Sequence, residues 1–129
     1  MPNIPAVVGH EVAGVVIKVG SNVKDIQVGD HVGIGYFVDS CLECYYCKND
    51  EENNCINGIT RTACGNILHG RVKTDNGKYS YGGRSEKMTV NRRFVSVIPK
   101  SYPLEKAAPI FCAGTLMALI AMHARLFIF

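Results

Sequence analysis

Four cysteines lie within fifteen residues of this chain, spaced C-x2-C-x2-C-x7-C, and this spacing constrains the segment that carries them. Short C-x2-C steps let successive thiolates point at one centre, so the pattern is typical of a tetrahedral zinc site. A closed shell of four sulfur ligands leaves no position for a substrate. The spacing therefore predicts one structural zinc ion that holds a loop together, with any chemistry elsewhere in the chain. The four residues are Cys41, Cys44, Cys47 and Cys55.

Two other uses of these cysteines stay open from the spacing alone. Disulfides need an oxidising compartment, yet the start, Met-Pro-Asn-Ile-Pro, lacks the basic and uninterrupted apolar segments of a secretory signal peptide. Ferredoxin-type iron–sulfur sites place the fourth cysteine three residues after the third, followed by proline. Here seven residues separate Cys47 from Cys55, and Ile56 follows. We therefore favour zinc and expect a cytoplasmic protein.

Composition excludes some partners. The 129 residues allow one domain with one core, and an apolar content of 47% argues against a disordered chain. The formal net charge of +3 is spread without a basic run, so we expect no nucleic-acid partner and no anionic membrane surface. The apolar segment from Ala107 to Phe129 is interrupted by Pro109, His123 and Arg125, so we do not expect it to span a membrane.

Short runs of β-branched residues between turn signals predict a mainly β, barrel-like domain. The expected strands cover residues 11–19, 31–38, 86–90 and 94–98, with further short strands near 67–72. Residues 1–99 would form this domain, with the metal-binding lobe at 39–56. After Pro99 the pattern becomes helical: one helix begins near Pro103, and a second runs from about Ala113 to His123 within a segment spanning 100–129.

Three further residues could carry chemistry, although each is weak evidence alone. His10 is a natural zinc ligand at the head of the first expected strand, and Glu11 is its acidic neighbour. Such a pair is more often a hydrogen-bonded surface pair. Cys112 and Cys64 are, by default, inert buried thiols.

Taken in order, these fragments resemble the medium-chain zinc-dependent alcohol dehydrogenases, in particular the NADP-dependent cinnamyl alcohol dehydrogenase-like branch. The resemblance is carried by GHEVAGVVIKVG, VGDHVGIG, CLECYYCKNDEENNC, GGRSEKMTVNRRFVSVIP and AAPIFCAG, over residues 2–115. It implies a GroES-like barrel with a structural zinc lobe held by the four cysteines. It also implies that His10 and Cys112 are ligands of a catalytic zinc and that Glu11 is the acidic catalytic residue beside that zinc.

The same resemblance implies an oxidoreductase that interconverts primary alcohols and aldehydes. The catalytic zinc keeps an open position for the substrate, and a separate Rossmann domain holds the NADP that exchanges hydride.

Two parts of the family pattern have no counterpart in this sequence. No cysteine precedes His10, so the first ligand of the catalytic zinc is missing and we expect low zinc occupancy there, with one zinc per chain in the lobe. No G-x-G-x-x-G follows a strand, so the Rossmann domain is absent and NADP would bind only in a full-length relative. We therefore expect a dehydrogenase fragment that is inactive alone.

An alternative is a non-enzymatic zinc-binding module that docks on a full-length relative. A third reading, an active enzyme that takes its NADP-binding part from a second polypeptide, is less favoured. Because the family packs the segment after Cys112 where its two domains join, Leu116, Leu119, Ile120 and residues 126–129 should be exposed here. We expect self-association through this apolar tail.

Overall fold

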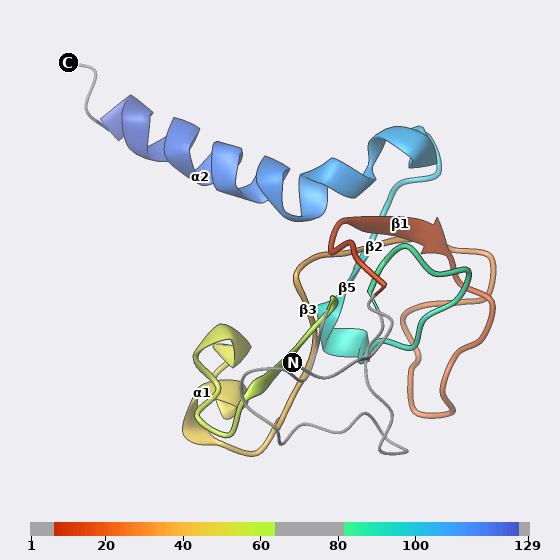
Figure 1. The fold of residues 1–129 in the computed structure, drawn as a ribbon, viewed down its shortest axis with the longest axis horizontal. Helices are drawn as coiled ribbons and strands as arrows, with labels where there is room; N and C mark the ends of the chain where they lie inside the picture. The colour runs from red at the N-terminus through yellow and green to blue at the C-terminus, as the bar shows by residue number, and fades with distance from the viewer. Residues whose placement is uncertain (1–6, 64–81, 127–129) are drawn as a thin grey trace.

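The structure, a computed structural model, describes residues 7–63 and 82–126. Figure 1 shows a body of short strands from which two parts extend in different directions: a small lobe around helix α1 (Tyr45–Lys48) and the long helix α2 (Ala113–Leu126). The strands expected near residues 67–72, and Cys64, lie outside the described residues.

Three strands form the larger sheet, in the order β1 (Val12–Val15), β2 (His31–Ile34), β5 (Val95–Val97). Both pairings are antiparallel, and the register sets Val12 and Val95 on either side of Ile34. Because side chains alternate between the faces of a strand, these three residues share one face. That face lines a cavity of about 310 Å³, closed by the loop after β1 and by residues 83–90.

The opposite face of this sheet receives the 3₁₀ helix η4 (Ala108–Phe111), which packs against Gly33. A Cβ atom at Gly33 would lie 1.8 Å from the ring of Phe111, and one at Gly35 would lie 2.4 Å from the Phe111 carbonyl oxygen. Only glycine permits this approach. The two glycines therefore allow η4 to pack closely against the sheet, which places Cys112, the residue after η4, near it.

The second sheet forms the base of the lobe. Strands β3 (Phe37–Ser40) and β4 (Ile59–Arg61) pair antiparallel, and between them lie α1 and the 3₁₀ helix η1 (Glu52–Asn54). The fully buried side chains in this part of the molecule are Val38, Cys47, Thr60 and Thr62. A cysteine at the centre of so small a core fits a lobe built around its sulfur atoms.

The expected strand at 86–90 is wrong. The described chain there makes bends and extended backbone without ladder pairing. Ser85 gives the physical reason, because its hydroxyl donates hydrogen bonds to the carbonyls of Gly82 and Lys87 at 2.9 and 3.2 Å. A serine hydroxyl that bonds its own neighbours competes with strand pairing.

The other expected elements are present with changed bounds. The strand expected at 11–19 is shortened to β1, and the one expected at 31–38 is divided into β2 and β3 at Gly35. The strand expected at 94–98 becomes the 3₁₀ helix η2 (Arg92–Phe94) followed by β5. The helix expected near Pro103 is the 3₁₀ helix η3 (Leu104–Lys106). Closure of the two sheets into one barrel stays a prediction.

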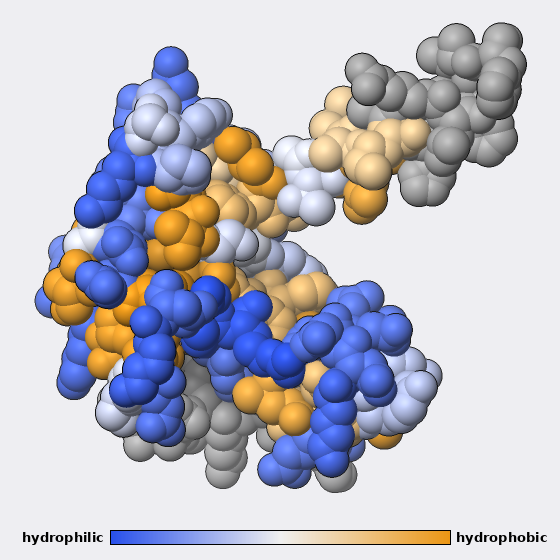
Figure 2. Space-filling model, turned by 180° about the vertical axis from the view of Figure 1, so that it is seen from behind, coloured by the Kyte–Doolittle hydropathy of each residue, from blue (hydrophilic) through white to orange (hydrophobic). Residues whose placement is uncertain are grey.

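Helix α2 confirms the helix expected from Ala113 and continues to Leu126. Its apolar side chains stand clear of the body, as Figure 2 shows from behind. The exposed fractions of Leu116, Leu119 and Ile120 are 60%, 50% and 54%, which confirms the exposure expected of these three. None of the helices in the described ranges is long and apolar enough to cross a bilayer.

Candidate metal centres

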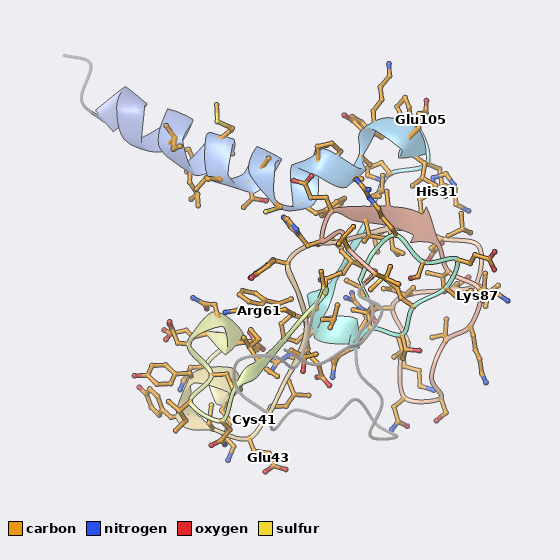
Figure 3. All side chains as sticks on the ribbon, in the orientation of Figure 1. His31, Cys41, Glu43, Arg61, Lys87 and Glu105 are labelled. Carbon is orange, nitrogen blue, oxygen red and sulfur yellow. The ribbon has the colours of Figure 1, made fainter. Side chains whose placement is uncertain are left out.

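The four cysteines of the lobe gather around one point. Their Sγ atoms all lie within 4.8 Å of one another. The Sγ atom of Cys47 is 3.5 Å from that of Cys44 and 3.9 Å from that of Cys41. Figure 3 shows Cys41 and Glu43 at the end of this lobe. Three separate pieces of chain supply the ligands: the turn after β3, helix α1, and the residue after η1.

These separations suit zinc. Zn–S bonds of about 2.3 Å in a tetrahedron place the sulfur atoms about 3.8 Å apart. A disulfide would need about 2.05 Å between sulfurs, and all four cysteines are free thiols. The donor set and its spacing therefore fit one tetrahedral zinc ion, and the disulfide alternative does not describe this arrangement.

Hydrogen-bond donors surround the sulfur of Cys41. It accepts from the backbone N–H of Cys44 and from the side-chain amide of Asn57, each at 3.4 Å. Hydrogen bonding from the backbone N–H of Glu43, opposed by burial, lowers the pKa of Cys41 to about 6. Donors around one sulfur stabilise its thiolate, the form that binds metal.

Cys55 behaves in the opposite way. Its thiol donates a hydrogen bond of 3.1 Å to the carbonyl of Gly58. Burial raises the pKa of Cys55 to about 12. Four thiolates at this distance repel one another. A cation bound among them removes this repulsion and favours the ionised form of each thiol.

A second cluster joins the two ends of the described chain. Donor atoms of His10, Glu11 and Cys112 lie within 4.8 Å of one another. The Glu11 carboxylate also accepts a hydrogen bond of 3.1 Å from the backbone N–H of Ala113, at the start of α2. Histidine, carboxylate and cysteine side chains are all zinc ligands, and three protein ligands leave the fourth position that a catalytic zinc site keeps open.

The segment before β1 is held in place by the segment around Gly83. The backbone N–H of Gly83 donates to the carbonyl of Gly9 at 2.8 Å, and that of Arg84 donates to Val8 at 3.0 Å. Gly9 has a φ of +104°, which an L side chain rarely adopts. Two backbone hydrogen bonds and the positive φ of Gly9 therefore set the orientation of the backbone at His10.

Tyr36 and Arg61 flank this second cluster, and sequence reasoning missed both. The rings of His10 and Tyr36 meet edge to face, 5.3 Å between centroids. The Arg61 guanidinium lies over the Tyr36 ring, 5.4 Å from its centroid. Figure 3 shows Arg61 on the side of the lobe that faces the body. No motif signals this stack, because its members become neighbours only when β2, β3 and β4 are in place.

The structure thus brings the seven candidate ligands together in two groups. The four cysteines lie in the lobe. The other group joins the two residues just before β1 to the residue just before α2. Within the described residues no other group of three or more such side chains could hold a metal ion.

Comparisons with known proteins point to one family. Residues 1–100 match the family model described as the alcohol dehydrogenase GroES-like domain. An NADP-dependent alcohol dehydrogenase C from Mycolicibacterium smegmatis is 45% identical over 114 residues, covering 88% of this chain and 31% of that protein. The curated relatives matched are much longer proteins, of which the chain spans 28–32%.

Solved structures give the same result. A cinnamyl alcohol dehydrogenase from Sorghum bicolor superposes with a TM-score of 0.74 and 42% identity, covering 92% of this chain and 33% of that one. A cinnamyl alcohol dehydrogenase from Helicobacter pylori, solved with NADP(H), gives a TM-score of 0.77 at 33% identity, covering 94% and 33%. With its two cysteine-containing clusters, its short-stranded body and its family match over residues 1–100, the chain belongs to the alcohol dehydrogenase GroES-like domain family.

Proposed function

We propose that the lobe, residues 39–56, holds one structural zinc ion with four cysteine thiolates as its ligands. The observation that carries this proposal is the convergence of four free thiols around a single point, with sulfur separations of 3.5 and 3.9 Å. A site of this kind contributes folding energy directly, since the unfolded chain rarely holds a preformed site and metal binding therefore favours the folded state. Cysteines that remain free thiols suit a reducing compartment, and we therefore propose that the protein is cytoplasmic.

Native mass spectrometry of the purified chain tests this proposal. We expect about one zinc per chain. Chelation should remove it and unfold the lobe. A metal-free chain with its cysteines in disulfides would overturn the assignment.

The second cluster is, in this proposal, the metal-binding face of an alcohol dehydrogenase active site. His10, Glu11 and Cys112 would hold a zinc ion, with Glu11 as the third ligand, and we expect weaker binding here than at the four thiolates of the lobe. A bound zinc supplies Lewis acidity that lowers the pKa of an alcohol oxygen. The domain boundary at residue 99, with a helical segment over 100–129, belongs to the same proposal.

The protein's own side chains then have distinct roles. The imidazole of His10 must be neutral to offer a ring nitrogen, and the edge of Tyr36 restricts the rotation of that ring. The carboxylate of Glu11 is held by the N–H of Ala113, so its position depends on where α2 begins. Cys112 directly follows η4, and the packing of η4 against Gly33 positions the Cys112 sulfur relative to His10.

The reaction supported best is the interconversion of primary alcohols and aldehydes with NADP. It would take place in a protein in which this domain is joined to a nucleotide-binding domain. The 129 residues contain no glycine-rich dinucleotide motif, so we expect no turnover from the purified chain alone. Absorbance of NADPH with a series of alcohols measures this, and appreciable turnover would overturn it.

A second candidate is a zinc-binding module without enzymatic activity that docks on a full-length relative. The exposed apolar side chains of α2 favour it, because a surface of this kind marks an interaction site. Co-purification with a full-length relative, lost when α2 is removed, would favour this candidate over the catalytic one.

A further inference from the structure

Arg93 reaches from η2 into the lobe and contacts it at three points. Its guanidinium donates hydrogen bonds to the backbone carbonyl of Cys47 at 3.0 Å and to the carboxylate of Asp50, and it forms an ion pair with Glu52 at 2.8 Å. These three residues belong to the chain between the second and the fourth cysteine. The side chain of Glu52 is 16% exposed, whereas that of Asp50 is 80% exposed, so the pair with Glu52 is the more shielded of the two ion pairs.

The lobe carries far more carboxylates than cations. Residues 39–56 contain five carboxylates and one lysine, a formal charge of −4 before any thiolate ionises. A zinc ion with four thiolates adds two more negative charges. Arg93 pairs with two of these carboxylates, those of Asp50 and Glu52. A cation at this position offsets the repulsion that zinc binding creates.

The contact with Cys47 acts on a ligand directly. Helix α1 ends at Lys48, so the carbonyl of Cys47 is one of the last in the helix, where carbonyls lack a partner within the helix. Arg93 supplies that partner. Cys47 is fully buried, and its sulfur lies within 4 Å of two other sulfur atoms, so its backbone position decides the ligand geometry.

The segment that carries Arg93 is itself anchored to the base of the lobe. The backbone N–H of Asn91 donates to Val38 at 3.0 Å, and its side-chain amide donates to Asp39 at 3.1 Å. The backbone that carries the Arg93 guanidinium is therefore hydrogen-bonded to β3 through the nearby Asn91.

We propose that Arg93 is a positioning residue for the structural zinc site, and that it slows zinc release by holding Cys47 and the acidic turn of the lobe in ligand geometry. This inference rests on the proposed zinc ion in the lobe. It concerns a residue that is not a ligand and that follows Cys55 by 38 positions in the sequence.

Arg92 provides a matched control within the same 3₁₀ helix. It pairs with Asp25 at 2.9 and 3.0 Å and donates to the carbonyl of Val95 at 2.7 Å, all outside the lobe. Arg92→Gln removes the same charge, from the neighbouring position, without touching the zinc ligands.

The experiment measures zinc release from the full chain into an excess of a chromogenic chelator. We expect Arg93→Gln to release zinc about tenfold faster than the wild type, which corresponds to about 1.4 kcal/mol. Arg92→Gln should stay within about twofold of the wild type. Because ion pairs are screened by salt, the ratio between Arg93→Gln and wild type should shrink in about 1 M salt, which loss of packing would not produce.

If Arg93→Gln does not fold, zinc release from Glu52→Gln tests the same proposal. This substitution removes the shielded partner while leaving the arginine in place, and we expect it to accelerate release by several fold. Equal release from wild type, Arg93→Gln and Glu52→Gln would overturn the positioning role while leaving the zinc assignment intact. A wild-type chain that purifies without zinc would instead overturn the proposed metal site itself.

Discussion

The contact between Gly33 and Phe111 predicts that Gly33→Ala is strongly destabilising. A Cβ atom at this position would lie 1.8, 1.9 and 2.4 Å from three ring carbons of Phe111. Ordinary carbon contacts begin near 3.5 Å, so the ring must retreat by roughly 2 Å. Overpacking of this kind costs about 1–3 kcal/mol. For a domain of this size, each kcal/mol lowers the Tm by about 4 °C, so a loss of about 4–12 °C is expected.

Gly14→Ala is the matched control for this experiment. Gly14 lies in the adjacent strand β1, and a Cβ atom there would meet nothing within 4 Å. The same substitution should therefore leave the Tm unchanged or slightly raised, because alanine reduces the conformational entropy of the unfolded chain. Thermal unfolding followed by circular dichroism compares the two variants.

A second variant tests the assigned cause. If the ring of Phe111 is what the new methyl group meets, Phe111→Leu should recover part of the stability of Gly33→Ala, giving a coupling energy of about 0.5–3 kcal/mol in a double-mutant cycle. An unfolding curve for Gly33→Ala that coincides with that of Gly14→Ala would refute the reasoning. Additive effects of the two substitutions at 33 and 111 would refute it as well.

Three further outcomes are expected. Cys47→Ser should lower the zinc content of the purified chain well below one per molecule, because a hydroxyl is a poor replacement for one of four thiolates; full zinc by elemental analysis would contradict the ligand assignment. A chain that ends at Gly114 should associate less in analytical ultracentrifugation than the full chain, since it lacks the exposed apolar residues of α2; stronger association would show that α2 protects the body. Hydrogen bonding to Arg92 lowers the pKa of Asp25 from 3.8, so the pair stabilises the fold above that pH and the contribution disappears as the pH falls through the lowered pKa. The stability difference between wild type and Asp25→Asn should follow that course in denaturant titrations, and a difference that grows in acid would contradict it.

The lobe could be predicted from the sequence because its ligands are local. Spacing alone brings Cys41, Cys44 and Cys47 to one side of a turn and a short helix. The pairing of His10 with Cys112 could not be obtained in this way. These residues lie at opposite ends of the described chain, and only the family resemblance placed them together.

Long-range contacts explain most of what sequence reasoning missed. Residues 31–38 read as one uninterrupted strand, but Gly35 lies where the Phe111 carbonyl approaches, and the strand divides there. Arg93 looks like any surface arginine in the sequence. Its role becomes visible only when η2 is seen beside the lobe, a contact that no local pattern encodes.

The paired strands at the base of the lobe make it an insert whose two ends are adjacent. Ser40 pairs with Ile59, so residues 41–58 leave the sheet and return to it at adjacent points. Two paired strands can be joined by an Asn-Gly turn without disturbing their register. A shortened chain of this design would keep the hairpin and lose the four cysteines. Grafted onto an unrelated hairpin, the excised stretch would bring its own four sulfur atoms with it.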